Sequence, residues 1–269
     1  MPNLTLLFVL SDGLILAYCL VYVDDLILTG NNTPFFTIII AQLGQKFSIK
    51  DLRPLHFLGI EVIHTINGLF LNQHQYIRDL LAKTSMNGVK DVTTPLFISI
   101  PLKLAYGSST VDPTEYRRVI SALQYLTLTC PDINFAVNKL SQFMHPPAQI
   151  HWTTTKQLLH YLKNTIFHGI NIRNTSNPAL TCFSNVDWAS SLDDRKSTSA
   201  YIIFLSPTPI LWSSKKQHTF ARSSTEAEYR ALATAPTESI WLLSLLHEMK
   251  SFPCYTHLHF YVIIWEPLS

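Results

Sequence analysis

Two adjacent carboxylates interrupt the most apolar stretch of the chain. Asp24 and Asp25 follow Tyr22-Val23 within the run Leu14–Leu28 (LILAYCLVYVDDLIL), whose other members are apolar or weakly polar. Ionised carboxylates cannot be buried among such residues without a large desolvation cost, so we expect them at an exposed turn or beside a cation. Because the flanking β-branched and aromatic residues favour strands, the sequence predicts a hairpin with the acidic pair at its tip.

Such a tip would suit a divalent metal ion. Mg²⁺ prefers carboxylate oxygens combined with substrate phosphates over a complete cage of protein ligands. Two such ions can activate the attacking oxygen and stabilise the leaving oxygen of an in-line phosphoryl transfer. The plain alternative is a solvated Asp-Asp turn, and the pair alone does not choose between these interpretations.

The flanking sequence favours the metal-dependent interpretation. The chain reads LVYVDDLILTG over 20–30, FSIKDLRPLHFLGIEV over 47–62 and GLFLNQHQYIRDLL over 68–81. These strings closely resemble the reverse transcriptase of Ty1/copia-type retrotransposons, and the resemblance runs through nearly the whole chain. It implies an RNA-directed DNA polymerase that uses Mg²⁺ on a primer–template, with Asp24 and Asp25 as catalytic and metal-binding residues.

The polymerase site is expected to be incomplete. The family carries its first catalytic carboxylate in a long segment before this motif, whereas only 21 residues precede Tyr22 here and Asp12 is their sole acid. We therefore expect a partial palm without turnover in isolation, and a complementing Pol chain is left open as a partner. Strands at Phe57–Val62 and Leu69–Leu71, around the turn Ile66-Asn67-Gly68, would belong to this palm.

Helices are expected in the first part and in the middle of the chain. Residues 91–111 are rich in Pro, Gly and Ser and indicate a linker, after which Asp112 and Pro113 predict a helix start. Apolar residues at helical spacing predict five helices: Thr33–Phe47, Gln73–Met86, Tyr116–Leu128, Asp132–Met144 and Trp152–Lys163. By resemblance, the last three form the thumb and connection.

The last third of the chain carries a second set of motifs. Strands are expected at Leu180–Phe183, Thr198–Leu205 and Ile210–Ser213, followed by a helix with a capping box between Ser223 and Glu226. The strings FSNVDWASSLDDRKSTSAYIIFL, LWSSKKQ and RSSTEAEYRALATA resemble the ribonuclease H domain of the same family. The resemblance implies cleavage of the RNA strand of an RNA–DNA hybrid by two metal ions that carboxylates hold.

This second site also departs from the family pattern. The resemblance assigns Glu228 as a catalytic and metal-binding residue, but Asn185 replaces the expected first-strand aspartate. An amide is a neutral ligand and cannot bridge two metals as a carboxylate does. Asp187 would share the strand face but lies about 6–7 Å along it, and Glu266 is the only acid after Glu248. We expect a truncated domain whose ribonuclease H chemistry is lost.

These patterns predict an α/β chain of the α+β type with three parts. Residues 1–95 would form the partial palm, 96–176 the helical thumb/connection and 177–269 the truncated ribonuclease H-like domain. Basic residues that could contact a nucleic-acid backbone are Lys139, Lys156, Lys163, Arg195, Lys196, Lys215 and Lys216, with Arg117, Arg118 and His160 beside them. For those of these residues that lie on predicted helices, the alternative interpretation is an ordinary solvated helix face without a nucleic-acid contact.

Composition sets the remaining limits. The hydrophobic fraction is 47% and the charged fraction 14%, against roughly 25% charged in typical soluble domains, and the net charge of +2 does not by itself indicate a nucleic-acid binder. Four scattered cysteines without a Cys-x-x-Cys pair argue against zinc or disulfides and for a reducing compartment. The apolar run Gly13–Val23 is too short to span a bilayer. We expect a non-membrane, intracellular protein of the cytoplasm or nucleus.

Three interpretations remain open from the sequence. The first is a polyprotein fragment of the transposable element, with both catalytic sites incomplete. The second is a remnant that binds an RNA–DNA hybrid or primer–template without catalysis. The third is a non-functional product that folds poorly, because low charge and unpaired palm strands favour aggregation.

Overall fold

The computed structural model describes residues 5–262, apart from 24, 50–55, 58, 87, 89, 91, 97–101, 105–110, 176–178 and 250–257, and only the backbone of residues 5, 56–57, 258–260 and 262. The chain forms two compact units, residues 1–58 and residues 59–269. Asp24, Glu266 and parts of the predicted linker lie outside the described residues. Within the described part, no helix is both long enough and apolar enough to cross a membrane.

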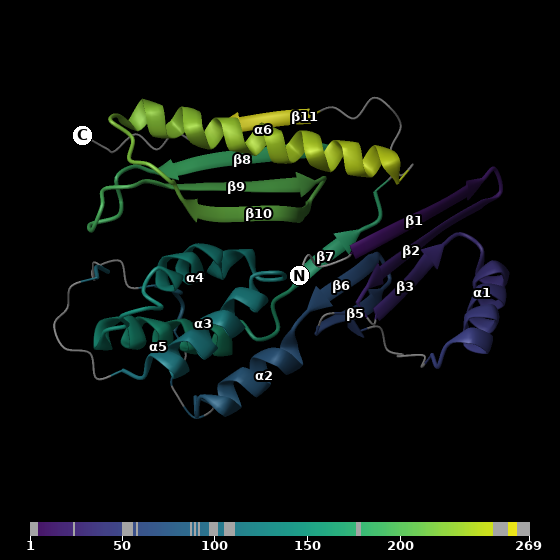
Figure 1. Ribbon diagram of the computed structural model, residues 1–269, viewed down its shortest axis with the longest axis horizontal. Coiled ribbons are helices and arrows are strands. Elements are labelled where there is room, and N and C mark those ends of the chain that lie inside the picture. The colour runs from purple at the N-terminus through teal and green to yellow at the C-terminus, as the bar shows by residue number, and fades with distance from the viewer. Residues whose placement is uncertain are drawn as a thin grey trace. The chain divides into compact units, whose positions relative to one another are not determined.

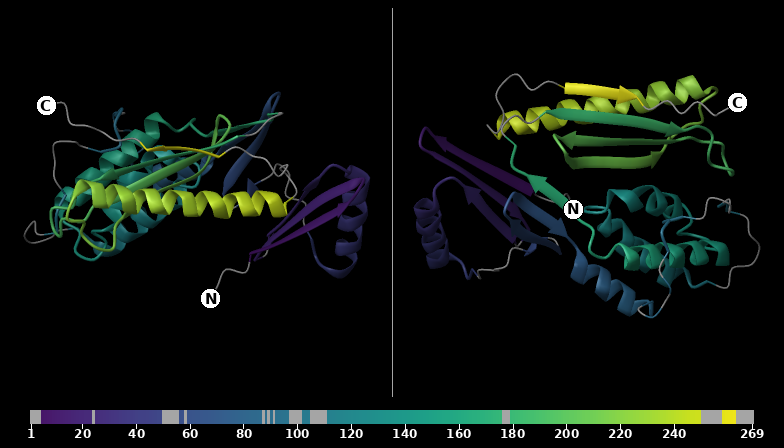
Figure 2. Two further views of the ribbon diagram at one scale, coloured as in Figure 1. Left: turned by 90° about the horizontal axis from the view of Figure 1, so that it is seen from above. Right: turned by 180° about the vertical axis from the view of Figure 1, so that it is seen from behind.

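The first unit is a three-stranded antiparallel sheet with one long helix (Figures 1 and 2). The sheet consists of β1 (Thr5–Asp12), β2 (Ile15–Tyr22) and β3 (Asp25–Gly30). They are followed by α1 (Thr33–Lys46) and by the two-residue strand β4 (His56–Phe57), which is not part of this sheet. The Asn32 side chain caps α1 by accepting the Phe35 N–H at 3.0 Å. The predicted hairpin and helix are confirmed, whereas β1 lies in a segment for which the sequence predicted no element.

The second unit begins with a small antiparallel sheet. Strands β5 (Ile60–Thr65) and β6 (Gly68–Asn72) meet at the predicted Asn67-Gly68 turn, where Thr65 pairs with Gly68. Strand β7 (Ile170–Arg173) then pairs antiparallel with β6, about a hundred positions later in the sequence. The sequence predicted no strand at this position, because β7 is short and gains its ladder only from a distant part of the chain.

Five helical segments form the main core of the second unit. They are α2 (His74–Lys83), α3 (Pro113–Leu126), η1 (Pro131–Ile133), α4 (Asn134–Ser141) and α5 (Gln149–Asn164). Their buried residues join in one cluster, called the helical core here, that includes Ile77, Leu81, Val119, Leu123, Leu140 and Leu158. Because α2 contributes to this core, it packs with the helices that the sequence assigned to the thumb/connection. The division into three domains at residues 95 and 176 stays a prediction.

The remaining elements form a four-stranded sheet with a long helix on one face (Figure 1). They are β8 (Leu180–Asp187), β9 (Thr198–Leu205), β10 (Thr208–Lys216), α6 (Ser224–Glu248) and β11 (Leu258–Val262). The strand order is β10-β9-β8-β11, with β11 parallel to β8 and the other pairs antiparallel. The predicted meander is confirmed, and the chain as a whole is a mixed α/β protein of the α+β type.

The start of α6 follows the predicted capping chemistry with one difference. The Ser223 hydroxyl accepts the Glu226 N–H at 3.1 Å, as a capping box requires. The Glu226 carboxylate, however, accepts the Arg222 N–H at 2.8 Å instead of that of Ser223. It also pairs with Arg230 one turn later, so Glu226 is fully engaged in holding the helix start.

Candidate functional site

The acidic hairpin is held by a tight turn and by the residues that follow β3. Tyr22 pairs with Asp25 across the hairpin, and Val23 in the turn adopts a left-handed φ of 51°. At the other end, the Asn31 side-chain oxygen accepts the Leu16 N–H at 2.8 Å. A Cβ on Gly30 would lie 2.1 Å from the Leu16 carbonyl oxygen, so the close approach of these strands requires glycine. The half-buried Asp25 is thereby fixed at the tip.

The other described acid of this unit lies at the far end of the sheet. Asp12 pairs with Ile15 at the start of β2, whereas Asp25 pairs with Tyr22 at its end. Ile15 and Tyr22 are seven steps apart along the extended strand, which is about 23 Å at about 3.3 Å per step. Asp12 therefore cannot supply a carboxylate to the Asp25 end of the hairpin.

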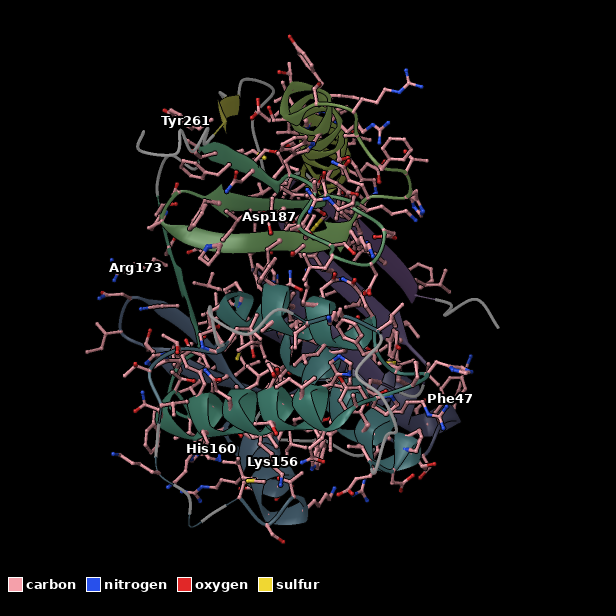
Figure 3. The ribbon with its side chains drawn as sticks, turned by 90° about the vertical axis from the view of Figure 1, so that its left-hand side faces the viewer. Phe47, Lys156, His160, Arg173, Asp187 and Tyr261 are labelled. Atoms are coloured by element: carbon pink, nitrogen blue, oxygen red, sulfur yellow. The ribbon has the colours of Figure 1, made fainter. Side chains whose placement is uncertain are left out.

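The second predicted site lies on the four-stranded sheet. Leu180 and Cys182 on β8 pack against Ala235 and Leu242 of α6. Side chains alternate along a strand, so Asn185 and Asp187 share the opposite face, as the sequence predicted, and both are exposed. Figure 3 labels Asp187 on this sheet.

Glu228 belongs to the layer on the other face of the sheet. It is half-buried on the first turns of α6. The Gln217 amide nitrogen joins the helix to β9 by donating to Ser199 Oγ at 2.8 Å and to the Ala227 carbonyl at 3.1 Å. Ser199 pairs with Val186, so Glu228 reaches the same end of the sheet as Asn185 but from the α6 side.

Neither predicted catalytic centre forms a metal site in the described part of the chain. No group of three or more His, Cys, Asp or Glu side chains there could hold a metal ion. Strand β11 takes the position beside β8, yet its sequence LHFYV brings no acid. At the second site the described donors therefore do not fit a two-metal centre, whereas the first site also depends on Asp24, which lies outside the described residues.

Two of the predicted phosphate-binding lysines are already engaged with an acid. Asp194 pairs with Lys216 at 2.8 Å and with Lys196 at 3.4 Å. Burial alone would raise the pKa of Asp194, but hydrogen bonds from Lys216, Ser191 and the Lys196 N–H hold it well below its usual range. Sequence reasoning missed this role, although the mixed charges of Asp193-Asp194-Arg195-Lys196 were a signal for it.

Lys139 has a comparable environment on α4. Its ammonium donates to the Ser190 carbonyl at 3.4 Å, and burial lowers its pKa while the nearby Asp187 charge opposes that shift. The Asp193 carboxylate accepts the Leu104 N–H at 2.9 Å, and the Trp212 indole donates to the Thr127 carbonyl at 2.8 Å. Lys139 therefore contributes to the contact between the helical core and the sheet.

The basic residues of α5 form a continuous stripe. Lys156, His160 and Lys163 are spaced four and three residues apart, which places them on one face of the helix. Lys156 lies over the Trp152 ring, with its nitrogen 5.7 Å from the ring centre, and Figure 3 shows Lys156 and His160 on this helix. We call these three residues the α5 stripe. Outside it, Arg195, Lys215, Arg117 and Arg118 are exposed.

Comparison with known proteins defines the class to which this hairpin and these helices belong. The family described as reverse transcriptase (RNA-dependent DNA polymerase) matches residues 5–98. The chain belongs to this family, as it occurs in the Pol polyproteins of copia-type retrotransposons. Such enzymes act on nucleic acid and generally use a divalent metal ion.

Three of the relatives come from plants. The chain is 48% identical over 246 residues to the retrovirus-related Pol polyprotein from transposon RE1 of Arabidopsis thaliana, covering 91% of this chain and 17% of that polyprotein. It is 44% identical over 228 residues to the uncharacterized mitochondrial protein AtMg00810 of the same plant, covering 83% of this chain and 93% of that protein. The corresponding polyprotein of Nicotiana tabacum transposon TNT 1-94 is 33% identical over 240 residues, which cover 86% of this chain and 18% of that polyprotein. No solved structure matches the chain.

These relatives fix the scale of the comparison. The chain spans less than a fifth of the length of the Pol polyproteins, 17% for RE1 and 18% for TNT 1-94. It corresponds to a segment of a retrotransposon Pol polyprotein.

Proposed function

We propose that this segment carries the acidic hairpin of a copia-type polymerase, a helical thumb/connection and a ribonuclease H-like domain, and that it catalyses neither reaction alone. Its retained activity would be binding of a primer–template or an RNA–DNA hybrid. A complementing Pol chain would be needed for polymerisation with Mg²⁺. The free thiols of Cys19, Cys130 and Cys182 support an intracellular setting.

The observation that carries the proposal is the separation of the acids. Asp12 and Asp25 lie at opposite ends of β2, about 23 Å apart. Phosphoryl transfer by two metals needs ions about 3.5–4 Å apart, so their carboxylate ligands must converge. Asp12, the other described acid of this unit, therefore cannot join the hairpin acids in such a centre.

The ribonuclease H-like assignment is supported by topology. Three antiparallel strands, a long helix that carries Glu228 and a parallel fourth strand are the arrangement that the resemblance of residues 183–235 leads us to expect. Asn185 stands at the first-strand position, and β11 carries no acid in its sequence. The domain would therefore keep the shape of a hybrid-binding nuclease without its chemistry.

Two activity assays test the proposal. We expect no extension of a DNA primer on an RNA template with Mg²⁺, and no cleavage of an RNA–DNA hybrid. Restoring the acid with Asn185→Asp should still give no cleavage, because Glu228 lies on the layer across the sheet and β11 brings no further carboxylate. Extension that disappears in an Asp25→Asn control would contradict the first part, and cleavage by Asn185→Asp would contradict the second.

Nucleic-acid binding is tested separately through its salt dependence. Replacing Lys156 and Lys163 by glutamine should reduce the slope of log affinity against log salt by about 1.8 for a duplex, since each neutralised phosphate contributes about 0.9. The matched control is the pair Lys46→Gln and Lys83→Gln, two exposed lysines outside the α5 stripe. Equal salt slopes for the two double variants in an anisotropy titration would show that the α5 stripe does not contact the phosphates.

A further inference from the structure

We propose that a pocket at the end of α5 binds one unpaired nucleobase of a bound nucleic-acid strand, with a preference for bases that carry an exocyclic amine. This inference rests on the proposed nucleic-acid binding and adds a site and a chemical selectivity to it. The pocket has a volume of about 480 Å³. We call it the aromatic pocket, and its lining includes Phe70, Thr129, Asp132, Tyr161, Phe167 and His168.

One wall of the aromatic pocket is an exposed aromatic platform. Phe167 is 73% exposed in the turn that follows α5. Its ring lies against that of His74 in a tilted arrangement, with centroids 5.0 Å apart and planes inclined by 34°. An aromatic ring held from behind and open in front is the surface on which nucleic-acid bases stack, at about 1–3 kcal/mol per base.

The lining of the aromatic pocket also offers a hydrogen-bond acceptor. The Tyr161 hydroxyl donates to Asp132 Oδ2 at 2.6 Å, which leaves the second carboxylate oxygen of Asp132 to accept from a ligand. Burial and the Asp132 charge raise the pKa of Tyr161, so this hydroxyl stays protonated. No Lys or Arg occurs among the described residues that line the pocket, so a phosphate group would find no permanently charged partner among them.

Polar groups directly behind the pocket are incompletely satisfied. Gln73 is 1% exposed, and its side-chain oxygen accepts the Thr129 hydroxyl at 2.7 Å. Its side-chain nitrogen and the Nε2 atom of His74 are buried without a hydrogen-bond partner. Buried polar atoms normally have partners. The Gln73 nitrogen can only donate, so it would pair with an acceptor such as a ring nitrogen or carbonyl of a base, while Asp132 would accept from an exocyclic amine. A planar, uncharged ring with amine donors matches these features.

The floor of the pocket depends on a glycine. A Cβ on Gly169 would lie 2.3 Å from the Leu71 carbonyl oxygen and 2.8 Å from the Phe70 ring. The absence of a side chain therefore lets the turn after α5 pass close to β6. Tyr161 directly follows His160 on the last turns of α5, so a nucleic-acid strand bound along the α5 stripe would pass the end of the helix at which the pocket lies.

The test is binding of short labelled single strands, measured by fluorescence anisotropy across a salt series. Phe167→Ala should weaken binding of an oligo-deoxycytidine by about five- to a hundredfold, with an unchanged salt slope, because stacking and not charge is removed. Oligo-deoxycytidine should bind more tightly than oligo-deoxythymidine, which has no exocyclic amine, and Asp132→Asn should narrow that difference. Phe220→Ala is the matched control, since Phe220 is 58% exposed on a different loop.

The outcomes separate the pocket from the wider proposal. Thermal melts check that each variant is folded. We expect Phe167→Ala to fold normally because the side chain of Phe167 is exposed. If Phe167→Ala binds within about twofold of the unchanged chain while the Lys156/Lys163 double variant shows the reduced salt slope, the aromatic pocket is overturned and the nucleic-acid interface stands. If the unchanged chain binds no strand, both are overturned.

Discussion

Leu81→Ala is expected to lower the free energy of unfolding by about 2–5 kcal/mol, the usual cost of deleting a buried leucine and leaving a cavity. Leu81 is 3% exposed on α2 and belongs to the helical core. Because the same cluster contains Val119, Leu140 and Leu158 from α3, α4 and α5, the loss should appear as a lower urea midpoint of the whole helical region. Far-ultraviolet circular dichroism during urea titration measures it.

This substitution also tests where the palm ends. The predicted boundary at residue 95 places α2 in a separate palm domain. In that case Leu81→Ala would leave the unfolding of α3–α5 unchanged. Arg78→Ala is the control, because Arg78 is exposed on the same helix and surface changes usually stay within about 0.5 kcal/mol. Hydrogen exchange of the α5 amides in the two variants should therefore differ clearly.

The second large effect concerns a buried histidine at the start of α5. His151 is fully buried and stacks on Phe143, with ring centroids 4.0 Å apart. Its Nδ1 accepts the Ala148 N–H at 2.9 Å, so the proton of the neutral ring lies on Nε2, which donates to the Lys103 carbonyl at 3.1 Å. His151→Ala would leave both backbone groups without this partner and open a cavity, at about 2–4 kcal/mol.

The same contacts make stability depend on pH. Burial lowers the pKa of His151 below its ordinary value of 6.5, while the Lys103 hydrogen bond and the Asp193 charge partly oppose the shift. The unfolded chain therefore takes up the proton first as pH falls, so this contribution is complete above pH 6.5 and decreases below it. His151→Ala should flatten that part of the stability–pH curve. Urea midpoints at several pH values measure this, and an equal slope in His151→Ala and in the half-buried control His160→Ala would contradict it.

Some of the elements could be predicted from local sequence signals alone. The strands around Asp25 follow from an apolar run broken by an acidic pair, and the Ser223 cap from a hydroxyl three residues before a glutamate. Helices α1 to α5 follow from apolar residues at helical spacing. These signals act within a few positions of the chain, so they can be recognised without knowing what lies across the fold. Strand β7 carried no such signal, because its ladder comes from β6.

The sequence by itself also determined the family and the identity of the acids and amides at both predicted sites. Only the tertiary structure decided which of those groups converge. It placed Asp12 and Asp25 at opposite ends of β2. It put Glu228 on the helix that covers one face of the sheet and Asn185 on the opposite face. It also paired Lys196 and Lys216 with Asp194. It also brought Phe167 onto His74 to form the aromatic pocket. Each of these results depends on contacts between distant parts of the chain, whose distances and charges no local pattern encodes.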